Sequence, residues 1–146
     1  MDHADIRLWL RLLYCSSHME SVLQSRISQE FGITLARFDL LSQLERAPEG
    51  LTMTDLSRRM MVSNGATTSL VDRLVEDGLV LREPHPSDRR TTIIRLTAEG
   101  RDKFLSMAGI HEGWVAGLLE GLDPKAKSGL IEGLGALKHH LEKLGV

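Results

Sequence analysis

The fold is decided by residues 63–97, which read SNGATTSLVDRLVEDGLVLREPHPSDRRTTIIRLT. The first part predicts a helix, because Ser63 can cap its start, apolar residues recur at helical spacing, and Gly78 can end it. Residues 79–83 and 91–96 are rich in Leu, Val, Ile and Thr and predict two strands. The segment between them is polar and contains two prolines. The stretch therefore predicts a helix followed by a β-hairpin with a long polar loop.

Two further helices are predicted upstream of this stretch. Thr34 can cap a helix that runs through Leu44, and residues 47–50 (Ala-Pro-Glu-Gly) interrupt it. Thr52, with Asp55 three residues later, can open a short helix that continues through Met60. Helix, turn, helix and hairpin in this order form the plan of a winged helix-turn-helix, whose second helix enters the major groove of DNA. The predicted fold class is mainly α with a small β-hairpin wing.

The helix that begins after Ser63 has one apolar and one polar face. Its inward side is predicted to carry Thr67, Leu70, Val71 and Leu74, and its outward side Asn64, Gly65, Thr68, Ser69 and Asp72. Small polar side chains near a helix N-terminus allow the backbone to approach phosphate and allow Asn, Ser and Thr to contact base edges. Arg73, one turn further on, is placed for phosphate. The alternative is an ordinary, well-capped surface helix.

The predicted hairpin loop carries Asp88, Arg89 and Arg90 at its tip. An arginine at such a tip can enter a narrow minor groove, where the negative potential is strongest. Asp88 can hold a neighbouring guanidinium by a fork-type pair. The alternative is a solvated charged turn.

Long apolar helices are predicted on both sides of the winged region. Residues 3–31 form one helix whose wide apolar surface predicts burial on two sides. Thr97 can cap a helix to about Glu120, and Asp123-Pro124 can open a last helix. Leucines in that last helix step by four and three residues, which is typical of packing against a partner helix, at Leu130, Leu134, Leu137, Leu141 and Leu144.

Glycines recur every four residues in the predicted fifth helix, at Gly109, Gly113, Gly117 and Gly121. Such a row favours close approach of another helix, and room for a bulky ligand is the alternative.

The composition is that of an ordinary globular domain. The chain has 146 residues, 42% of them hydrophobic and 26% charged, which excludes disordered and collagen-like classes. No apolar run approaches ~20 residues, so no membrane span or membrane partner is expected. The N-terminus is acidic and lacks the pattern of a signal peptide, and the single Cys15 cannot form an internal disulfide, so a cytoplasmic location is expected. A net charge of -2 argues against a uniformly basic surface for nucleic acid, but it is compatible with a local basic patch.

Three motifs carry a resemblance to a known family. They are residues 63–74 (SNGATTSLVDRL), Gly78-Leu79-Val80, and a wing signature formed by Asp88-Arg89-Arg90 and Leu96-Thr97-Ala98-Glu99-Gly100. Together they resemble the multiple-antibiotic-resistance regulator (MarR) family. The pattern D-x-R…L-T-x-x-G is specific when it follows such a helix pair, and the resemblance extends over essentially the whole chain.

The resemblance implies one domain over residues 1–146, with dimerisation helices at 3–31 and 98–146 and a DNA-binding lobe at 34–97. It implies a homodimer that binds a pseudo-palindromic, double-stranded operator, usually as a repressor. No cofactor is expected. It also implies release by a small aromatic-acid ligand or its coenzyme A thioester. Arg90 matches the family's minor-groove arginine, and the matches to major-groove positions are Ser63, Asn64, Gly65, Thr68 and Ser69. Ser69 is smaller than the larger or basic residue that many members carry there.

A polar stripe crosses the otherwise apolar first helix, at Arg7, Arg11, Tyr14 and His18. A carboxylate ligand needs such donors beside aromatic or apolar walls. Arg37, His111 and Trp114 are candidates to complete the pocket. The alternative is a face that meets water or acids of a partner subunit.

Other functions have weaker support in the sequence. Redox sensing through Cys15 is one alternative, although Leu12 and Met19 share its apolar face, where thiols usually serve as inert packing. No Cys/His pair has the spacing of metal ligands. The sequence also shows no nucleophile with a base and no phosphate-binding loop, so an enzyme is not indicated. A winged-helix protein-interaction module is the other alternative, and steep salt dependence of binding would favour DNA over it.

Overall fold

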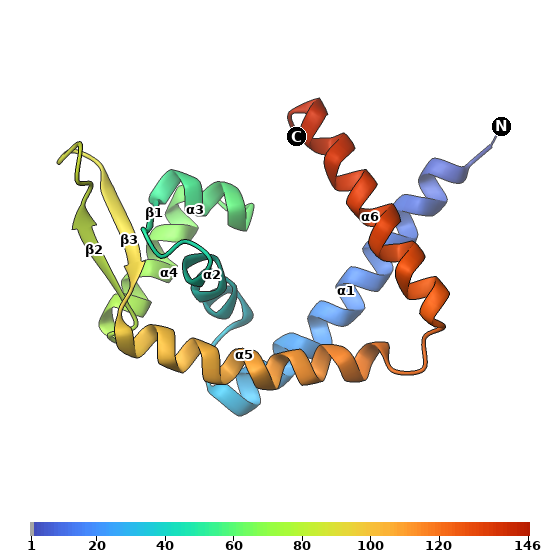
Figure 1. Cartoon of the computed structure of the whole chain (residues 1–146), viewed down its shortest axis with the longest axis horizontal. Coiled ribbons are helices and arrows are strands. Elements are labelled where there is room, and N and C mark those ends of the chain that lie inside the picture. Colours follow the sequence, from blue (N-terminus) through green and yellow to red (C-terminus); the bar gives the residue numbers. More distant parts are fainter. Residues whose placement is uncertain (1) are drawn as a thin grey trace. The chain divides into compact units, whose positions relative to one another are not determined.

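The computed structural model describes residues 2–146, in two units: one ends at Trp114 and the other spans Val115–Val146. The elements, labelled in Figure 1, are α1 (Ala4–Phe31), α2 (Leu35–Glu45), β1 (Leu51–Thr52), α3 (Met53–Met60), α4 (Asn64–Glu76), β2 (Val80–Pro84), β3 (Thr92–Leu96), α5 (Ala98–Leu119) and α6 (Pro124–Leu144). The unit boundary falls near the end of α5. The predicted fold class, mainly α with a β-hairpin wing, is confirmed.

Side-chain caps set the starts of most helices. The side-chain oxygens that accept a backbone N–H two or three residues ahead belong to Thr34, Thr52, Ser63 and Asp123. Thr97 accepts from Gly100 N at 2.9 Å at the start of α5. Because a cap satisfies one of the free N–H groups of the first turn, these starts could be predicted from local sequence.

The sheet has one strand more than the predicted hairpin. Its order is β1-β3-β2, with both pairings antiparallel. Leu51 lies opposite Ile94, and Val80 lies opposite Leu96. β1 contains two residues, which is too short for a strand pattern to show in the sequence.

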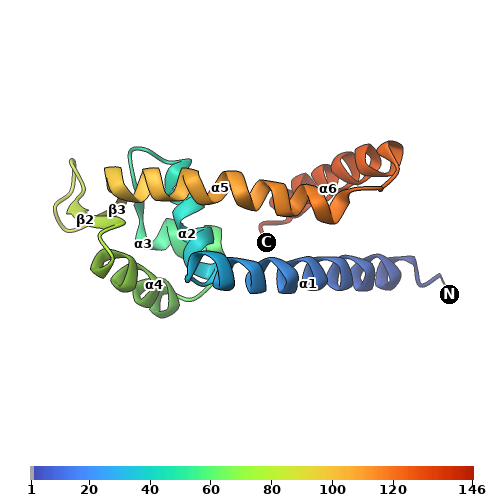
Figure 2. The same ribbon diagram turned by 90° about the horizontal axis from the view of Figure 1, so that it is seen from below.

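The core of the first unit is built around α2, which packs against α1, α3, α4 and β3. Leu40, Leu41, Leu56, Leu74 and Ile94 are fully buried there. This packing holds α4 and the hairpin on one scaffold. In Figures 1 and 2 the hairpin lies at the opposite end of this unit from the first turns of α1.

Much apolar surface on α1 stays exposed. Ile27 is its only buried residue, whereas Ile6 and Trp9 are more than half exposed. The burial on two sides that the sequence predicts is therefore not provided by the described residues of this chain.

α6 has no buried residue, and four of the five seam leucines are exposed, namely Leu130, Leu134, Leu141 and Leu144. The predicted glycine row is shorter than expected, because α5 ends at Leu119 and Gly121 adopts a left-handed φ of +86° in the turn that follows. Gly121 therefore serves the turn. None of the helices within residues 2–146 combines the length and the apolarity that a bilayer crossing requires.

Candidate nucleic-acid interface

The two faces of α4 lie as the sequence predicts. Thr67, Val71 and Leu74 are fully buried. The residues predicted to face outward are exposed, namely Asn64, Gly65, Thr68, Ser69 and Asp72. Ser63 Oγ accepts from Ala66 N at 3.1 Å, and the first turn of the helix is open to solvent. The helix therefore presents small polar side chains and a positive dipole end on one surface.

A buried hydroxyl pair braces the helix-turn-helix. Ser57 Oγ of α3 and Thr67 Oγ1 of α4 lie 2.7 Å apart, and both residues are buried. Thr67 Oγ1 also donates to Ser63 O at 3.0 Å. Because buried polar groups are costly when unpaired, this pair fixes how α4 sits on α3. The sequence predicted Thr67 to face inward but gave no indication of Ser57 as its partner.

Two arginines near the exposed face of α4 are paired with acids. Arg73 lies on the exposed surface with its Nε 3.6 Å from Asp77, the residue that caps the C-terminal end of α4. Asp72 forms an ion pair with Arg82 of β2. Arg82 was not singled out from the sequence, because its partner lies ten residues away on another element.

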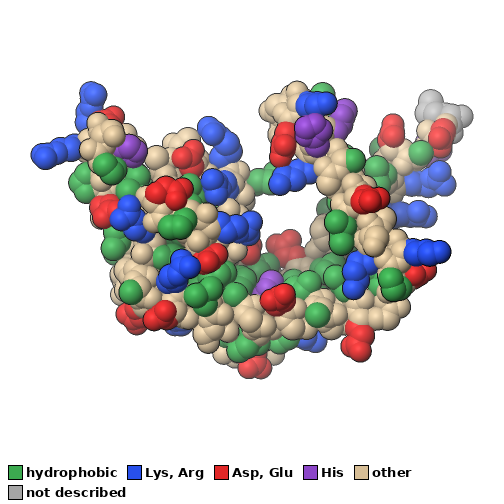
Figure 3. Space-filling model, viewed as in Figure 1, with side chains coloured by type: hydrophobic (Ala, Val, Ile, Leu, Met, Phe, Trp, Pro, Cys, Tyr) green, Lys and Arg blue, Asp and Glu red, His purple; other side chains and the backbone are tan. Residues whose placement is uncertain are grey.

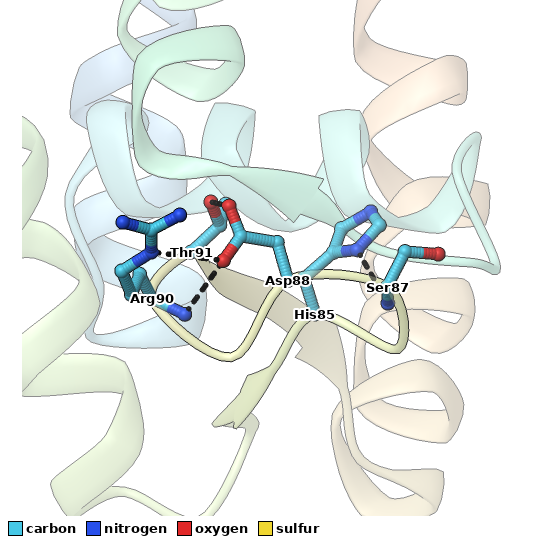
Figure 4. A network of polar contacts seen from close by, with 5 residues as sticks. All are labelled: His85, Ser87, Asp88, Arg90 and Thr91. Atoms are coloured by element: carbon cyan, nitrogen blue, oxygen red, sulfur yellow. Dashed lines mark hydrogen bonds and ion pairs between the residues drawn. The ribbon is translucent and has the colours of Figure 1, made fainter.

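The strands β2 and β3 and the loop between them form the wing. His85 N donates to Thr91 O at 2.8 Å and closes the loop. Figure 4 shows the Asp88 carboxylate at the centre of a small polar network, where it accepts from Arg90 N at 3.0 Å and from Thr91 Oγ1 at 3.3 Å. The network gives the loop a defined conformation.

The wing tip projects its arginines into solvent. The Arg90 side chain is 95% exposed, and its Nε lies 3.5 Å from Asp88 Oδ1. This contact is looser than the fork-type pair that the sequence predicts. Arg89 is also exposed, and Figure 3 shows basic side chains protruding at the tip of the hairpin. Both guanidinium groups are accessible to a negatively charged partner.

The polar stripe, Arg7, Arg11, Tyr14 and His18, is exposed along α1. The rings of Tyr14 and His18 lie 4.4 Å apart, centre to centre, and Arg7 Nη2 lies 3.7 Å from Asp2 Oδ1. Arg37 lines a different site, a cavity of about 500 Å³ beside α4 whose walls include Val62, Leu70 and Arg73.

His111 and Trp114 of α5 belong to an aromatic cluster. The His111 ring lies 4.7 Å from that of Phe38 and 6.4 Å from that of Trp114, which stacks on Phe31 at 5.2 Å. Burial lowers the pKa of His111 below its usual value, because the charged form loses hydration. The neutral imidazole is therefore favoured in this cluster.

One polar cavity was not predicted. Glu20 and Gln24 of α1 and Asp39 of α2 line about 300 Å³, together with Met60 and Val62. The pKa of Asp39 is raised, first by burial and then by the Glu20 charge, while Arg46 opposes the rise. The sequence gives little indication of this cavity, because Glu20 and Asp39 are far apart along the chain.

Cys15 is exposed, in contrast to the packed environment that its apolar neighbours predicted. Leu12 and Met19, the apolar residues on its side of α1, are half-buried. Within residues 2–146, no three His, Cys, Asp or Glu side chains are grouped so that they could hold a metal ion.

Comparisons with known proteins agree on one family. The sequence model of the MarR family matches residues 31–91. The transcriptional repressor YetL of Bacillus subtilis is 28% identical over 142 residues, which cover 97% of this chain and 84% of YetL. A MarR family transcriptional regulator from Silicibacter pomeroyi is 32% identical, with a TM-score of 0.76, over 97% of this chain and 96% of its own.

Two further solved structures share the fold. Sco3205 of Streptomyces coelicolor, solved in complex with DNA, has a TM-score of 0.82 and 24% identity, over 97% of this chain and 89% of its own. CouR of Rhodococcus jostii RHA1, solved with p-coumaroyl-CoA, has a TM-score of 0.77 and 22% identity, over 89% of this chain and 90% of its own. Because the chain folds as a winged helix-turn-helix and is 32% identical to a MarR regulator over 97% of its length, this protein belongs to the MarR family of DNA-binding transcriptional regulators.

Proposed function

We propose that the protein is a homodimeric repressor that binds a pseudo-palindromic operator and is released from it by a small effector. Two exposed features carry the proposal: small polar residues on the first turns of α4, and solvent-exposed arginines at the wing tip. YetL, a repressor, supports the direction of regulation. Sco3205, which has the same fold, supports double-stranded DNA as the partner.

In this proposal α4 lies in the major groove. Ser63, Asn64, Gly65, Thr68 and Ser69 face base edges and nearby phosphates, and Arg73 faces phosphate. Arg90 enters the flanking minor groove, with Arg89 and Asp88 beside it. Footprinting of the DNA around the protein's own gene tests this, followed by titration of salt against the protected fragment. Binding that does not weaken as salt rises would favour a protein partner over DNA.

Arg90→Ala is expected to weaken operator binding by about 1–3 kcal/mol, because a groove-inserted guanidinium is lost. Circular dichroism should be unchanged, since the side chain is 95% exposed. Fluorescence anisotropy with the protected fragment measures the affinity. Lys125→Ala, an exposed cation at the start of α6, is the control and should bind as wild type does. An unchanged affinity for Arg90→Ala would remove the wing from the interface.

The homodimer is proposed from apolar surface that the chain leaves open. Residues 3–31 and 98–146 are assigned to dimerisation, and residues 34–97 to the DNA-binding lobe. Exposed Ile6, Leu10 and Leu13 on α1, and the seam leucines of α6, are the groups that an obligate interface covers. Gly109, Gly113 and Gly117 meet nothing within 4 Å of an added Cβ in this chain, which leaves them free to meet a partner helix.

The effector is proposed to be an aromatic acid or its coenzyme A thioester. CouR, which has the same fold, was solved with p-coumaroyl-CoA. The donors proposed for the anionic end are Arg7, Arg11, Tyr14 and His18, with Arg37, His111 and Trp114 as further candidates. Release requires that the effector bind the DNA-incompetent arrangement more tightly than the competent one. A screen of aromatic acids and thioesters against the protein–operator complex identifies it.

Arg11→Ala and His18→Ala are expected to bind the operator normally and to respond poorly to the effector found in that screen. Each variant loses a charge-assisted contact, which should weaken effector binding by about 1.5–3 kcal/mol. Operator release is followed by anisotropy during effector titration. Arg26→Ala, an exposed arginine of α1 outside the stripe, serves as the control. Release of both variants at the wild-type effector concentration would show that the stripe is a solvated or subunit-pairing face.

A further inference from the structure

An acidic residue lies in the middle of the exposed face of α4. Asp72 follows Thr68 by four residues and Ser69 by three, so the three side chains share one side of the helix. The Asp72 side chain is 60% exposed. In the proposed complex this face meets DNA, where a bare carboxylate would be repelled by the phosphates. The surface therefore requires something that neutralises Asp72.

Arg82 supplies that charge from the wing. Its guanidinium Nη2 pairs with Asp72 Oδ1, which joins the middle of β2 to α4. Arg82 lies opposite Ile94, a fully buried residue of β3, so its backbone is held in the sheet. About a third of its side chain is exposed, against 95% for Arg90.

The other arginine of α4 is paired differently. Arg73 contacts Asp77, the C-cap residue of α4, and does not tie the helix to the wing. Arg82–Asp72 is the ion pair in the described residues that connects α4 to β2.

We propose that Arg82 is a positioning residue for DNA binding. It neutralises Asp72 and holds the wing strand at one place along α4, so that the helix and the wing tip reach DNA in register. It acts through Asp72 rather than by touching DNA. This inference rests on the proposed placement of α4 against DNA.

A double-mutant cycle tests the proposal. The variants are Arg82→Gln, Asp72→Asn and the double variant, each titrated by anisotropy against the duplex protected by the wild-type protein, over a range of salt. Arg101→Gln is the matched control, because Arg101 pairs with Glu45 at 3.5 Å between α5 and α2, which carry none of the proposed DNA contacts. Circular dichroism and thermal melting report whether each variant folds.

Arg82→Gln alone should lose about tenfold or more in affinity, because an unpaired carboxylate then faces the phosphates. Asp72→Asn, and the double variant, should stay within about fivefold of wild type, since an exposed pair contributes little by itself. The rescue of Arg82→Gln by Asp72→Asn is the expected signature. A purely structural pair would instead lower the melting temperature of both single variants without this rescue.

Two results would overturn the proposal. If Arg82→Gln and the double variant bind the duplex equally weakly, and the slope of log affinity against log salt falls by about one, Arg82 contacts a phosphate directly. If Arg82→Gln binds as wild type does, the pair has no role in binding. Should Arg82→Gln not fold, Asp72→Asn decides by itself, because a strong loss of affinity there would mean that Asp72 contacts a base.

The proposed function is judged separately. Wild-type binding to the duplex and the loss on Arg90→Ala test the placement of α4 and the wing. If these hold while the double-mutant cycle shows no rescue, only the role of Arg82 is rejected.

Discussion

Leu141→Glu is expected to yield protein that is unfolded or aggregated. Leu141 belongs to the leucine seam of α6, and 40% of its surface is open in the single chain. If this seam is the proposed dimer interface, the substitution buries a carboxylate without a partner. Obligate dimers leave no stable folded monomer, so loss of the interface costs the fold as well.

The measurement is sedimentation velocity together with circular dichroism. His139→Glu is the matched control, because it adds the same charge to an exposed residue on the opposite side of α6. The control should remain a folded dimer. A well-folded, soluble Leu141→Glu monomer would contradict the assignment of residues 98–146 to dimerisation.

Gly100→Ala is expected to cost at least about 3 kcal/mol of folding free energy, because the first turn of α5 has no room for a methyl group. A Cβ at Gly100 would lie 1.9 Å from the carbonyl oxygen of Leu79. That oxygen belongs to backbone, and it accepts from Thr97 N at 3.1 Å. Thr97 Oγ1 also donates to Gly78 O at 2.7 Å. The clash between the added methyl group and Leu79 O therefore cannot relax without breaking the hydrogen bonds that hold the start of α5 to residues 78–79.

Thermal melting measures this effect, with an expected fall of roughly 6–12 °C in Tm for a chain of this size. Asp102→Ala, an exposed residue of the same helix turn, is the control and should melt near the wild-type temperature. A Gly100→Ala melt within about 2 °C of wild type would show that the helix start moves away from Leu79 at little cost.

Local chemistry explains which parts of the fold could be predicted. A cap such as Ser63 or Asp123 acts on N–H groups only two or three residues away, so the sequence alone shows it. The inward face of α4 is equally visible, since the burial of Val71 and Leu74 follows from helical spacing. The exposed arginines of the wing tip follow from a turn-rich loop between two strands.

Contacts between distant residues could not be predicted in this way. β1 is a strand only because Leu51 finds Ile94 on β3, and two residues carry no pattern of their own. Gly121 fits the four-residue spacing of the glycine row, yet its left-handed backbone places it in the turn after α5. For the candidate effector site, the sequence supplied donors of the correct chemistry but could not say which of them share a cavity.

The sequence by itself determined the order of helices, the wing, the inward and outward sides of α4, and the family, because each depends on neighbouring residues or on a contiguous motif. Only the tertiary structure decided that Ser57 braces Thr67, that Arg82 pairs with Asp72, and that Arg37 lines a cavity beside α4 while the stripe lies exposed along α1. The physical reason is range. Periodicity and capping act within a few residues, whereas ion pairs, buried hydroxyl pairs and cavities form between side chains that only the packed core brings together.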